Sequence, residues 1–107
     1  MPNNGLITNL PYGACVEVPV YVDRNGFRPV HVGPLPMQLV ALVQTSSIVE
    51  EMAVEASLIG DPRLVFQACA YDPLTASVLS LAETKAMVDE MLEINRPHLP
   101  QFKHFKS

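Results

Sequence analysis

The stretch that most constrains this fold runs from Cys15 to Val32 and has the pattern of a β-hairpin. Alternate positions of its first half are valine, a period of two that is typical of a strand with one buried face. These residues are Val16, Val18, Val20 and Val22. The pair Asn25-Gly26 follows and predicts a tight turn, because both residue types tolerate positive φ. Residues 27–32 then return as the second strand, and the hairpin closes at Gly33.

The sequence after Gly33 predicts helices that use this hairpin as a packing platform. Pro34 and Pro36 end the strand and open a long helix, which ends near Gly60, a residue suited to the left-handed position after a helix. The apolar residues of this helix recur mostly at spacings of three and four, as expected for one buried face. They are Leu39, Leu42, Val43, Val49, Met52, Ala53, Ala56 and Ile59.

Three further helix starts are predicted by capping residues. Asp61-Pro62 and Asp72-Pro73 each place an N-cap aspartate before a proline at the first helical position. Ser80 and Glu83 match a capping box, and the helix that follows runs to about Asn95. The residues of this helix expected to face inward are Ala86, Met87, Met91, Leu92 and Ile94. The predicted fold class is therefore α+β, a β-hairpin platform followed by long helices.

The composition indicates that the chain exposes apolar surface. It has 107 residues, one domain at most, yet 49% of them are hydrophobic, 17% are charged and the mean hydropathy is +0.20. A chain of this size has a large surface relative to its volume, so apolar patches should remain uncovered. The tail after Pro97 adds Leu99, Phe102 and Phe105, which could dock on a neighbour. We therefore expect a homo-oligomer or a part of a larger protein.

Charge and patterning argue against several classes of partner. The formal net charge of −4 argues against nucleic acid binding, since few cations are available to replace phosphate counterions. No targeting signal is visible, and the longest apolar run, Leu39 to Val43, is too short to span a membrane. We therefore expect a cytoplasmic protein without a membrane partner, in which Cys15 and Cys69 are buried apolar residues.

No constellation of residues in this chain predicts an active site. The five glycines are scattered singly, so the chain has no phosphate-binding glycine loop. His31, His98 and His104 lack metal-ligand spacing with cysteine or carboxylate residues, and no serine has the context of a nucleophile. We accordingly assign no catalytic, cofactor-binding or metal-binding residue within the chain.

An ordered set of motifs nevertheless resembles the C-terminal part of the family 4 glycoside hydrolases. The set covers nearly the whole chain, and its order is far more specific than any single motif. The motifs are Asn4-Gly5-Leu6-Ile7-Thr8-Asn9-Leu10-Pro11, Val16-Glu17-Val18-Pro19, Val22-Asp23, Gly26, Pro29, Leu35-Pro36, Ala53-Val54-Glu55-Ala56, Gly60-Asp61, Asp72-Pro73-Leu74-Thr75 and Met87-Val88-Asp89-Glu90-Met91-Leu92. Residues 14–19 and 72–76 are most similar to the α-galactosidase branch, while the α-galacturonidase and 6-phospho-glycosidase branches stay open.

This resemblance implies a fold related to lactate and malate dehydrogenases, in which a nucleotide-binding domain precedes an α+β substrate domain. It also implies NAD and a divalent metal, usually manganese, as cofactors of the intact enzyme. In the implied reaction the sugar C3 hydroxyl is oxidised, a tyrosine removes the C2 proton, the C1 leaving group is eliminated, water adds and the hydride returns. The implied substrates are α-galactosides or related hexosides.

The chain departs from this family pattern in what it lacks. In similar proteins the glycine-rich NAD loop, the metal-binding Cys and His and the catalytic Asp and Tyr all lie upstream of the matched region. We therefore expect residues 1–107 to be a C-terminal segment without the nucleotide-binding domain, binding neither cofactor and inactive by itself. The alternative is a non-enzymatic oligomerisation or interaction module.

The loop from Asn3 to Pro11 is the candidate for a ligand contact in the intact enzyme. Its asparagine amides can donate and accept toward sugar hydroxyls or a nicotinamide amide, and its glycine would let the backbone approach a ligand closely. The candidate residues that would position ligands beside the substrate cleft are Asn3, Asn4, Gly5 and Asn9. The alternative is an inert connector whose asparagines only cap turns.

Overall fold

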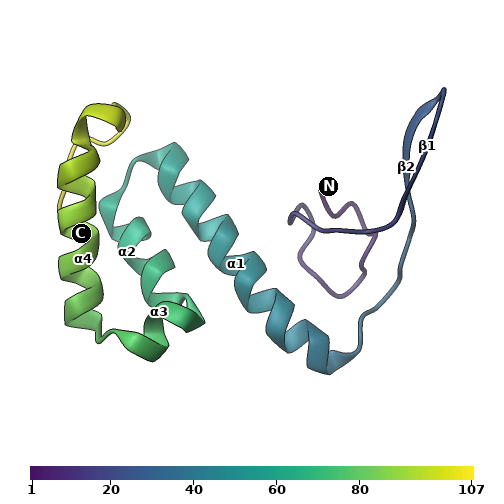
Figure 1. The fold of residues 1–107 in the computed structure, drawn as a ribbon, viewed down its shortest axis with the longest axis horizontal. Coiled ribbons are helices and arrows are strands. Elements are labelled where there is room, and N and C mark those ends of the chain that lie inside the picture. The colour runs from purple at the N-terminus through teal and green to yellow at the C-terminus, as the bar shows by residue number, and fades with distance from the viewer. The chain divides into compact units, whose positions relative to one another are not determined.

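The computed structural model describes all 107 residues, which form two compact units, Met1–Ile48 and Val49–Ser107. The elements in chain order are the strands β1 (Val20–Asp23) and β2 (Gly26–Pro29), the helices α1 (Met37–Ile59), α2 (Pro62–Tyr71), α3 (Pro73–Val78) and α4 (Leu81–Asn95), and the short 3-10 helix η1 (Arg96–His98) (Figure 1). Helix α1 begins in the first unit and ends in the second. One small sheet combined with helices confirms the predicted α+β class.

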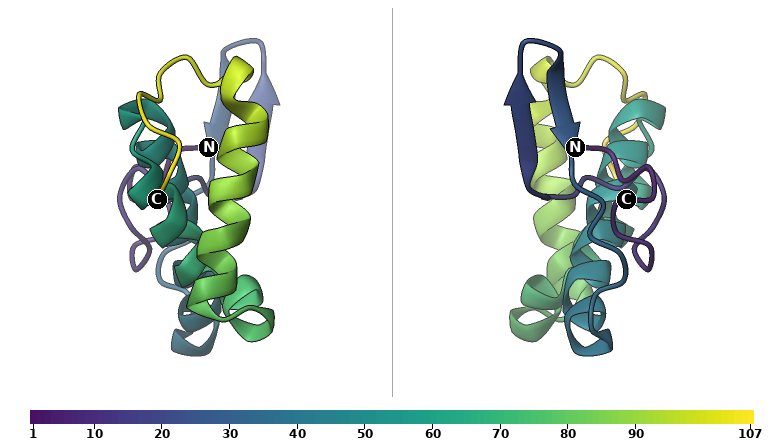
Figure 2. Two further views of the ribbon diagram at one scale, coloured as in Figure 1. Left: turned by 90° about the vertical axis from the view of Figure 1, so that its left-hand side faces the viewer. Right: turned by 90° about the vertical axis from the view of Figure 1, so that its right-hand side faces the viewer.

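The predicted hairpin is present, with shorter strands than expected (Figure 2). β1 and β2 pair antiparallel from Val20 opposite Pro29 to Asp23 opposite Gly26, which leaves Arg24 and Asn25 as the turn. Of the pair Asn25-Gly26, only Gly26 has a positive φ, 104°. The Asp23 carboxylate accepts a hydrogen bond of 2.7 Å from the Asn25 backbone N–H. This bond closes the turn without a positive φ at Asn25.

The hairpin does not serve as the predicted packing platform. Val16 is buried, but Val22 is 68% exposed and Phe27, opposite it, is 73% exposed. The reason is that the residues that enter the core, including Val16, precede the first paired residue, Val20. The core of this unit is built by the N-terminal loop and the first turn of α1, from Ile7, Leu10, Val16 and Val40, with Leu6, Val18 and Leu35 packed against it. A two-stranded sheet beside such a core has nothing in its own unit to cover it.

Helix α1 buries few of the residues predicted to face inward. Ala56 is fully buried, whereas Leu42 is 72% exposed and Ile59 is 60% exposed. Val40 and Ser47 are buried in their place. Apolar residues lie on all sides of the helix among polar ones, so the spacing of three and four did not single out one face, and neither unit covers the rest of its surface.

The Val49–Ser107 unit has its own core between α2, α4 and the C-terminal tail. The buried residues are Val88, Leu92 and Phe102, and half-buried partners surround them, namely Val65, Phe66, Cys69, Met87, Leu99 and Phe105. The apolar tail therefore docks on its own unit. The Arg96 guanidinium lies 4.4 Å from the centroid of the Phe105 ring, and the Ser107 backbone N–H donates to the Asp89 carboxylate at 2.6 Å.

The buried face of α4 is narrower than predicted. Its buried residues are Thr84, Val88 and Leu92, which recur every four positions. Met91 is 55% exposed and Ile94 is 67% exposed, so their predicted inward orientation is wrong. A helix that meets its neighbours along one row buries only that row, and Thr84 fits there because its hydroxyl donates to the Ser80 carbonyl at 3.0 Å.

The predicted helix caps are confirmed. Asp61 and Asp72 accept backbone hydrogen bonds at the starts of α2 and α3, each followed by proline. Ser80 and Glu83 form the capping box of α4. Gly60 follows α1 with a φ of 73° and donates its N–H to the Ala56 carbonyl at 2.9 Å. These local signals set the boundaries of the helices.

The two cysteines differ in exposure. Cys15 is exposed, so its predicted burial is wrong, because it falls on the outward position next to the buried Val16. Cys69 is half-buried, and this burial raises the pKa of its thiol.

No helix has both the length and the apolar character needed to cross a membrane.

Candidate functional site

Asn3 is the organising side chain of the candidate loop. It is 1% exposed. Its Nδ2 donates to the carbonyl oxygens of Ile7, Leu10 and Pro11 at 2.9, 3.2 and 3.0 Å, and its Oδ1 accepts from the Ile7 backbone N–H at 3.0 Å. One amide thus satisfies several backbone groups of the loop, and its burial keeps it from contacting a ligand.

Asn9 connects the loop to the segment that leads into α1. Its Nδ2 donates to the Leu35 carbonyl at 2.8 Å, and its Oδ1 accepts from the Leu35 backbone N–H at 2.9 Å. These two bonds reproduce the pairing of a strand, although no strand is present there. Backbone bonds from Thr8 to Gly33 and from Val32 to Leu6 hold the same two segments together. The Asn9 amide therefore also has a structural role, because both of its hydrogen bonds are made with the Leu35 backbone.

Asn4 and Gly5 differ from these two asparagines. The Asn4 side chain is exposed and makes no hydrogen bond within the chain. Gly5 has a φ of 86°, and a Cβ placed on it would meet no atom within 4 Å. Of the four candidate residues, these two are adjacent and free of side-chain bonds, whereas Asn3 bonds within the loop and Asn9 bonds to Leu35.

The surroundings of this open pair are neutral. No residue from Met1 to Ala14 has a charged side chain. The Asn4 amide and the free backbone near Gly5 offer both donors and acceptors without attracting an ion. This chemistry suits the hydroxyl groups of a neutral polyol better than a phosphate or a carboxylate.

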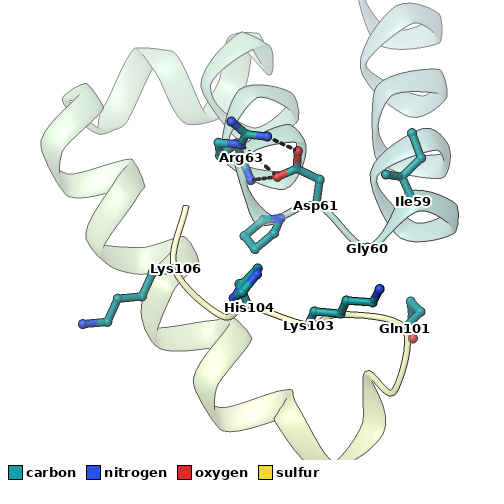
Figure 3. A pocket seen from close by; sticks show the side chains of 9 residues that line it. Ile59, Gly60, Asp61, Arg63, Gln101, Lys103, His104 and Lys106 are labelled. Atoms are coloured by element: carbon teal, nitrogen blue, oxygen red, sulfur yellow. Dashed lines mark hydrogen bonds and ion pairs between the residues drawn. The ribbon is translucent and has the colours of Figure 1, made fainter.

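A separate pocket lies in the Val49–Ser107 unit, between the Gly60–Arg63 turn and the C-terminal tail (Figure 3). Its volume is about 390 Å³. The tail passes so close to Gly60 that a Cβ there would lie 2.3 Å from the Gln101 carbonyl oxygen. The Gln101 side chain donates to the Ser57 carbonyl at 3.3 Å and fixes the same approach. Sequence reasoning missed this pocket, because the only signals for it are a glycine and the scattered basic residues of the tail.

The model of the "Family 4 glycosyl hydrolase C-terminal domain" matches residues 1–75. The chain belongs to the family 4 glycosyl hydrolases. This confirms the resemblance of its ordered motifs, and the match includes the whole candidate loop and the start of the helical unit.

Curated relatives in family 4 extend the match toward the C-terminus. The chain is 39% identical over 101 residues to an α-galactosidase of Bacillus subtilis and 40% identical over 102 residues to one of Rhizobium meliloti. These alignments cover 94% and 95% of this chain but only 23% and 21% of the relatives. The chain thus spans about a fifth of their length.

Solved structures of family 4 support the fold. A 6-phospho-α-glucosidase from gut microorganisms, solved in complex with NAD and glucose-6-phosphate, is 32% identical with a TM-score of 0.83 and covers 96% of this chain. A second 6-phospho-α-glucosidase structure, in complex with NAD and Mn²⁺, is 24% identical with a TM-score of 0.85. This chain covers 23% of each.

The residues of this family 4 chain do not fit the cofactors that the family implies. No group of three or more His, Cys, Asp or Glu side chains is placed to hold a metal ion. The glycines lie singly, so no glycine-rich turn faces a helix start as a dinucleotide needs.

Proposed function

We propose that the whole protein to which this chain contributes is a glycosidase that hydrolyses α-galactosides or related hexosides. The family match over residues 1–75 carries this proposal. Two relatives near 40% identity are α-galactosidases, which favours that substrate class. The proposed reaction is NAD-dependent oxidation, elimination, addition of water and reduction, with manganese, in the cytoplasm where NAD is available.

In this proposal residues 1–107 are the C-terminal segment of the substrate domain. Since the chain's own donor groups do not fit NAD or manganese, other residues of the enzyme must hold both. The chain alone is then expected to bind neither cofactor and to leave a nitrophenyl galactoside unchanged. Turnover by the pure 107-residue chain, or micromolar binding of NAD or Mn²⁺ in calorimetry, would contradict this.

The proposed contribution of this segment is to position substrate through the Asn4-Gly5 tip of the loop. Asn3 and Asn9 would act behind it by keeping the tip in place, since their amides are used by backbone groups. The exposed Asn4 amide would reach a sugar hydroxyl directly. A rigid base with an open tip is the usual arrangement of a binding loop.

Alanine substitutions in the intact enzyme separate this role from that of a connector. Asn4→Ala is expected to lower activity at an unchanged melting temperature. Asn9→Ala is expected to lower both, because two hydrogen bonds to Leu35 are lost. Full activity of Asn4→Ala would show that the tip is an inert turn.

An oligomerisation module is the second candidate, and the exposed apolar residues favour it. In the Met1–Ile48 unit they include Tyr21, Val22, Phe27, Leu39 and Leu42. A free-standing unit rarely leaves so many large apolar side chains in water. We propose that the isolated chain self-associates through α1 as a symmetric dimer. Light scattering at high concentration should return about twice the monomer mass of 11.7 kDa, and a monomer mass would contradict the proposal.

The experiment that tests the glycosidase proposal completes the enzyme. This chain would replace the matched 101 residues of the Bacillus subtilis α-galactosidase, which are 39% identical to it. The hybrid is expected to cleave a nitrophenyl α-galactoside when NAD and manganese are added, and the same host without any C-terminal segment serves as the control. A folded hybrid that is as inactive as that control would overturn the proposed role.

A further inference from the structure

The positive charges of the Val49–Ser107 unit that lack a partner meet in the pocket beside Gly60. This unit has five Lys and Arg residues. Arg63, Lys85 and Arg96 are each paired with a carboxylate. Lys103 and Lys106 have no carboxylate partner, and both line this one pocket. In a chain with a net charge of −4, this is a local excess of cations.

The carboxylate in the pocket lining does not neutralise these lysines. Asp61 Oδ1 accepts from the backbone N–H and the Nε of Arg63 at 2.9 and 3.2 Å, and Oδ2 accepts from Nη2 at 2.9 Å. The side-chain hydrogen bond with Arg63 holds the pKa of Asp61 below its usual value and raises the pKa of Arg63. Asp61 thus pairs chiefly with Arg63, the charge of His104 adds the smallest contribution to its lowered pKa, and no lysine is bonded to it.

The tail also brings an imidazole to the pocket. Figure 3 shows the His104 ring beside the start of α2 and the Lys103 side chain along the tail toward Gln101, while Lys106 extends away from them. The pocket volume of about 390 Å³ exceeds what a single small ion fills and lies in the range of small-ligand sites.

We propose that this pocket binds a phosphoryl dianion, with Lys103 and His104 as its direct partners and Lys106 attracting it from a greater distance. Ammonium groups act on phosphate as point charges from several directions, and a dianion gains about twice as much from them as a monoanion does. The same chemistry belongs to inorganic phosphate and to a phosphorylated sugar. The spare volume would hold the sugar of the second.

The test follows the three histidine side chains of the 107-residue chain by NMR while sodium phosphate is added at constant pH and ionic strength. The His104 ring protons are expected to shift and saturate. His31 and His98 do not line the pocket and act as internal references. His104→Gln assigns the resonance. Parallel titrations use glucose 6-phosphate and glucose.

Two variants and a matched control separate a site from general charge attraction. Lys103→Gln is expected to weaken phosphate binding at least about fivefold, and Lys103→Gln with Lys106→Gln at least about tenfold. Arg24→Gln removes another exposed cation without a carboxylate partner, in the hairpin turn, and should change nothing. All three positions are exposed, so folding should be preserved.

Each outcome decides the proposal. Tighter binding of glucose 6-phosphate than of phosphate would identify a sugar phosphate as the ligand, and equal binding would identify the free anion. The proposal is overturned if His104 does not saturate, if all three histidines shift together, if glucose moves His104, or if Arg24→Gln weakens binding as much as Lys103→Gln.

Discussion

Both units have an apolar core, but the Met1–Ile48 unit pairs the backbone of its irregular segments through the side-chain amides of Asn3 and Asn9, whereas the Val49–Ser107 unit uses several helix caps. Asn3 alone satisfies four backbone groups in the first unit. In the second, Asp61, Asp72 and Ser80 each cap one helix. An irregular segment must pair its buried backbone through side chains, and a helix pairs most of its own.

This difference predicts which single substitutions will lower stability most. Structure that depends on one buried amide should fail when that amide is removed. A unit that depends on several caps should lose only a small part of its stability when one cap is removed. The four predictions below test this contrast, from the largest expected effect to the smallest.

Removing the Asn3 amide is expected to have the largest effect. Asn3→Ala leaves the carbonyls of Leu10 and Pro11 and the Ile7 N–H without their partner, while the Ile7 carbonyl keeps a bond of 3.4 Å from the Leu10 N–H. Each unpaired buried group costs about 1 to 3 kcal/mol, and partial exposure after relaxation reduces the sum, so we expect about 3 to 4 kcal/mol.

Hydrogen exchange provides the measurement for this prediction. Amide protons of the first unit should lose protection, while those of α4 keep it. Asn4→Ala is the matched control, because that side chain is exposed and should change stability by less than about 0.5 kcal/mol. Equal effects of the two substitutions would remove the distinction between the units.

Gly60→Ala is expected to be the most damaging single change in the turn before α2. The Cβ would lie 2.3 Å from the Gln101 carbonyl oxygen, and φ is 73°. Backbone strain and displacement of the tail should together cost about 2 kcal/mol or more. Gly5→Ala has a similar φ of 86° with open space around the Cβ, so it isolates the strain alone.

Thermal unfolding of the two glycine variants gives the comparison. Gly60→Ala should lower the melting temperature of its unit and release Phe102 from the core. Gly5→Ala should cost about 1 kcal/mol in its own unit. A Gly60→Ala variant with an intact tail would mean that the close passage at Gln101 contributes little.

Removing one cap from the helical unit is expected to have a modest effect. Ser80→Ala breaks the capping box of α4 and should cost about 1 kcal/mol. Ser77→Ala is the control, since its exposed hydroxyl donates only to the Leu74 carbonyl. Denaturant unfolding measures both. A loss as large as that of Asn3→Ala would show that the helical unit also depends on single groups.

The smallest expected effect is a loosening of the tail in acid. Hydrogen bonds from the Ser107 backbone N–H, then from its hydroxyl, and from Lys85 lower the pKa of Asp89 to about 2. Because the folded pKa lies below the usual value of 3.8, this stabilisation is complete above about pH 4 and is lost as the pH falls toward 2.

The Ser107 amide resonance reports this change directly. It should move toward a free-chain position between pH 4 and pH 2. Asp89→Asn removes the titrating group, so its Ser107 resonance should show no such transition. A transition that persists unchanged in Asp89→Asn would show that a carboxyl group other than that of Asp89 causes it.

Much of the helical unit could be predicted from the sequence because its signals act over three or four residues. The caps at Asp61, Asp72 and Ser80 and the terminator at Gly60 formed as expected. The α+β class and the family resemblance followed from motifs in order along the chain. The turn of the hairpin was located by Asn25-Gly26 for the same reason, although only the glycine took the positive φ.

The candidate site could be predicted only in part. The asparagine-rich loop was identified by its composition, but the sequence could not tell the buried Asn3 and the bridging Asn9 from the exposed Asn4. That choice depends on Leu35, which lies 26 residues beyond Asn9 and is brought near only by the fold. The pocket at Gly60 forms only because the C-terminal tail passes close to the Gly60–Arg63 turn, so no local sequence pattern could predict it.

The sequence by itself therefore determined the family, the fold class and where the helices start, since these rest on residue order and on contacts within a turn. Only the tertiary structure decided which apolar residues are covered. Phe102 is buried because the tail returns to α4, while Val22 and Leu42 have the same hydrophobic character and remain exposed. Burial depends on what surrounds a side chain, and residues distant in sequence supply those surroundings.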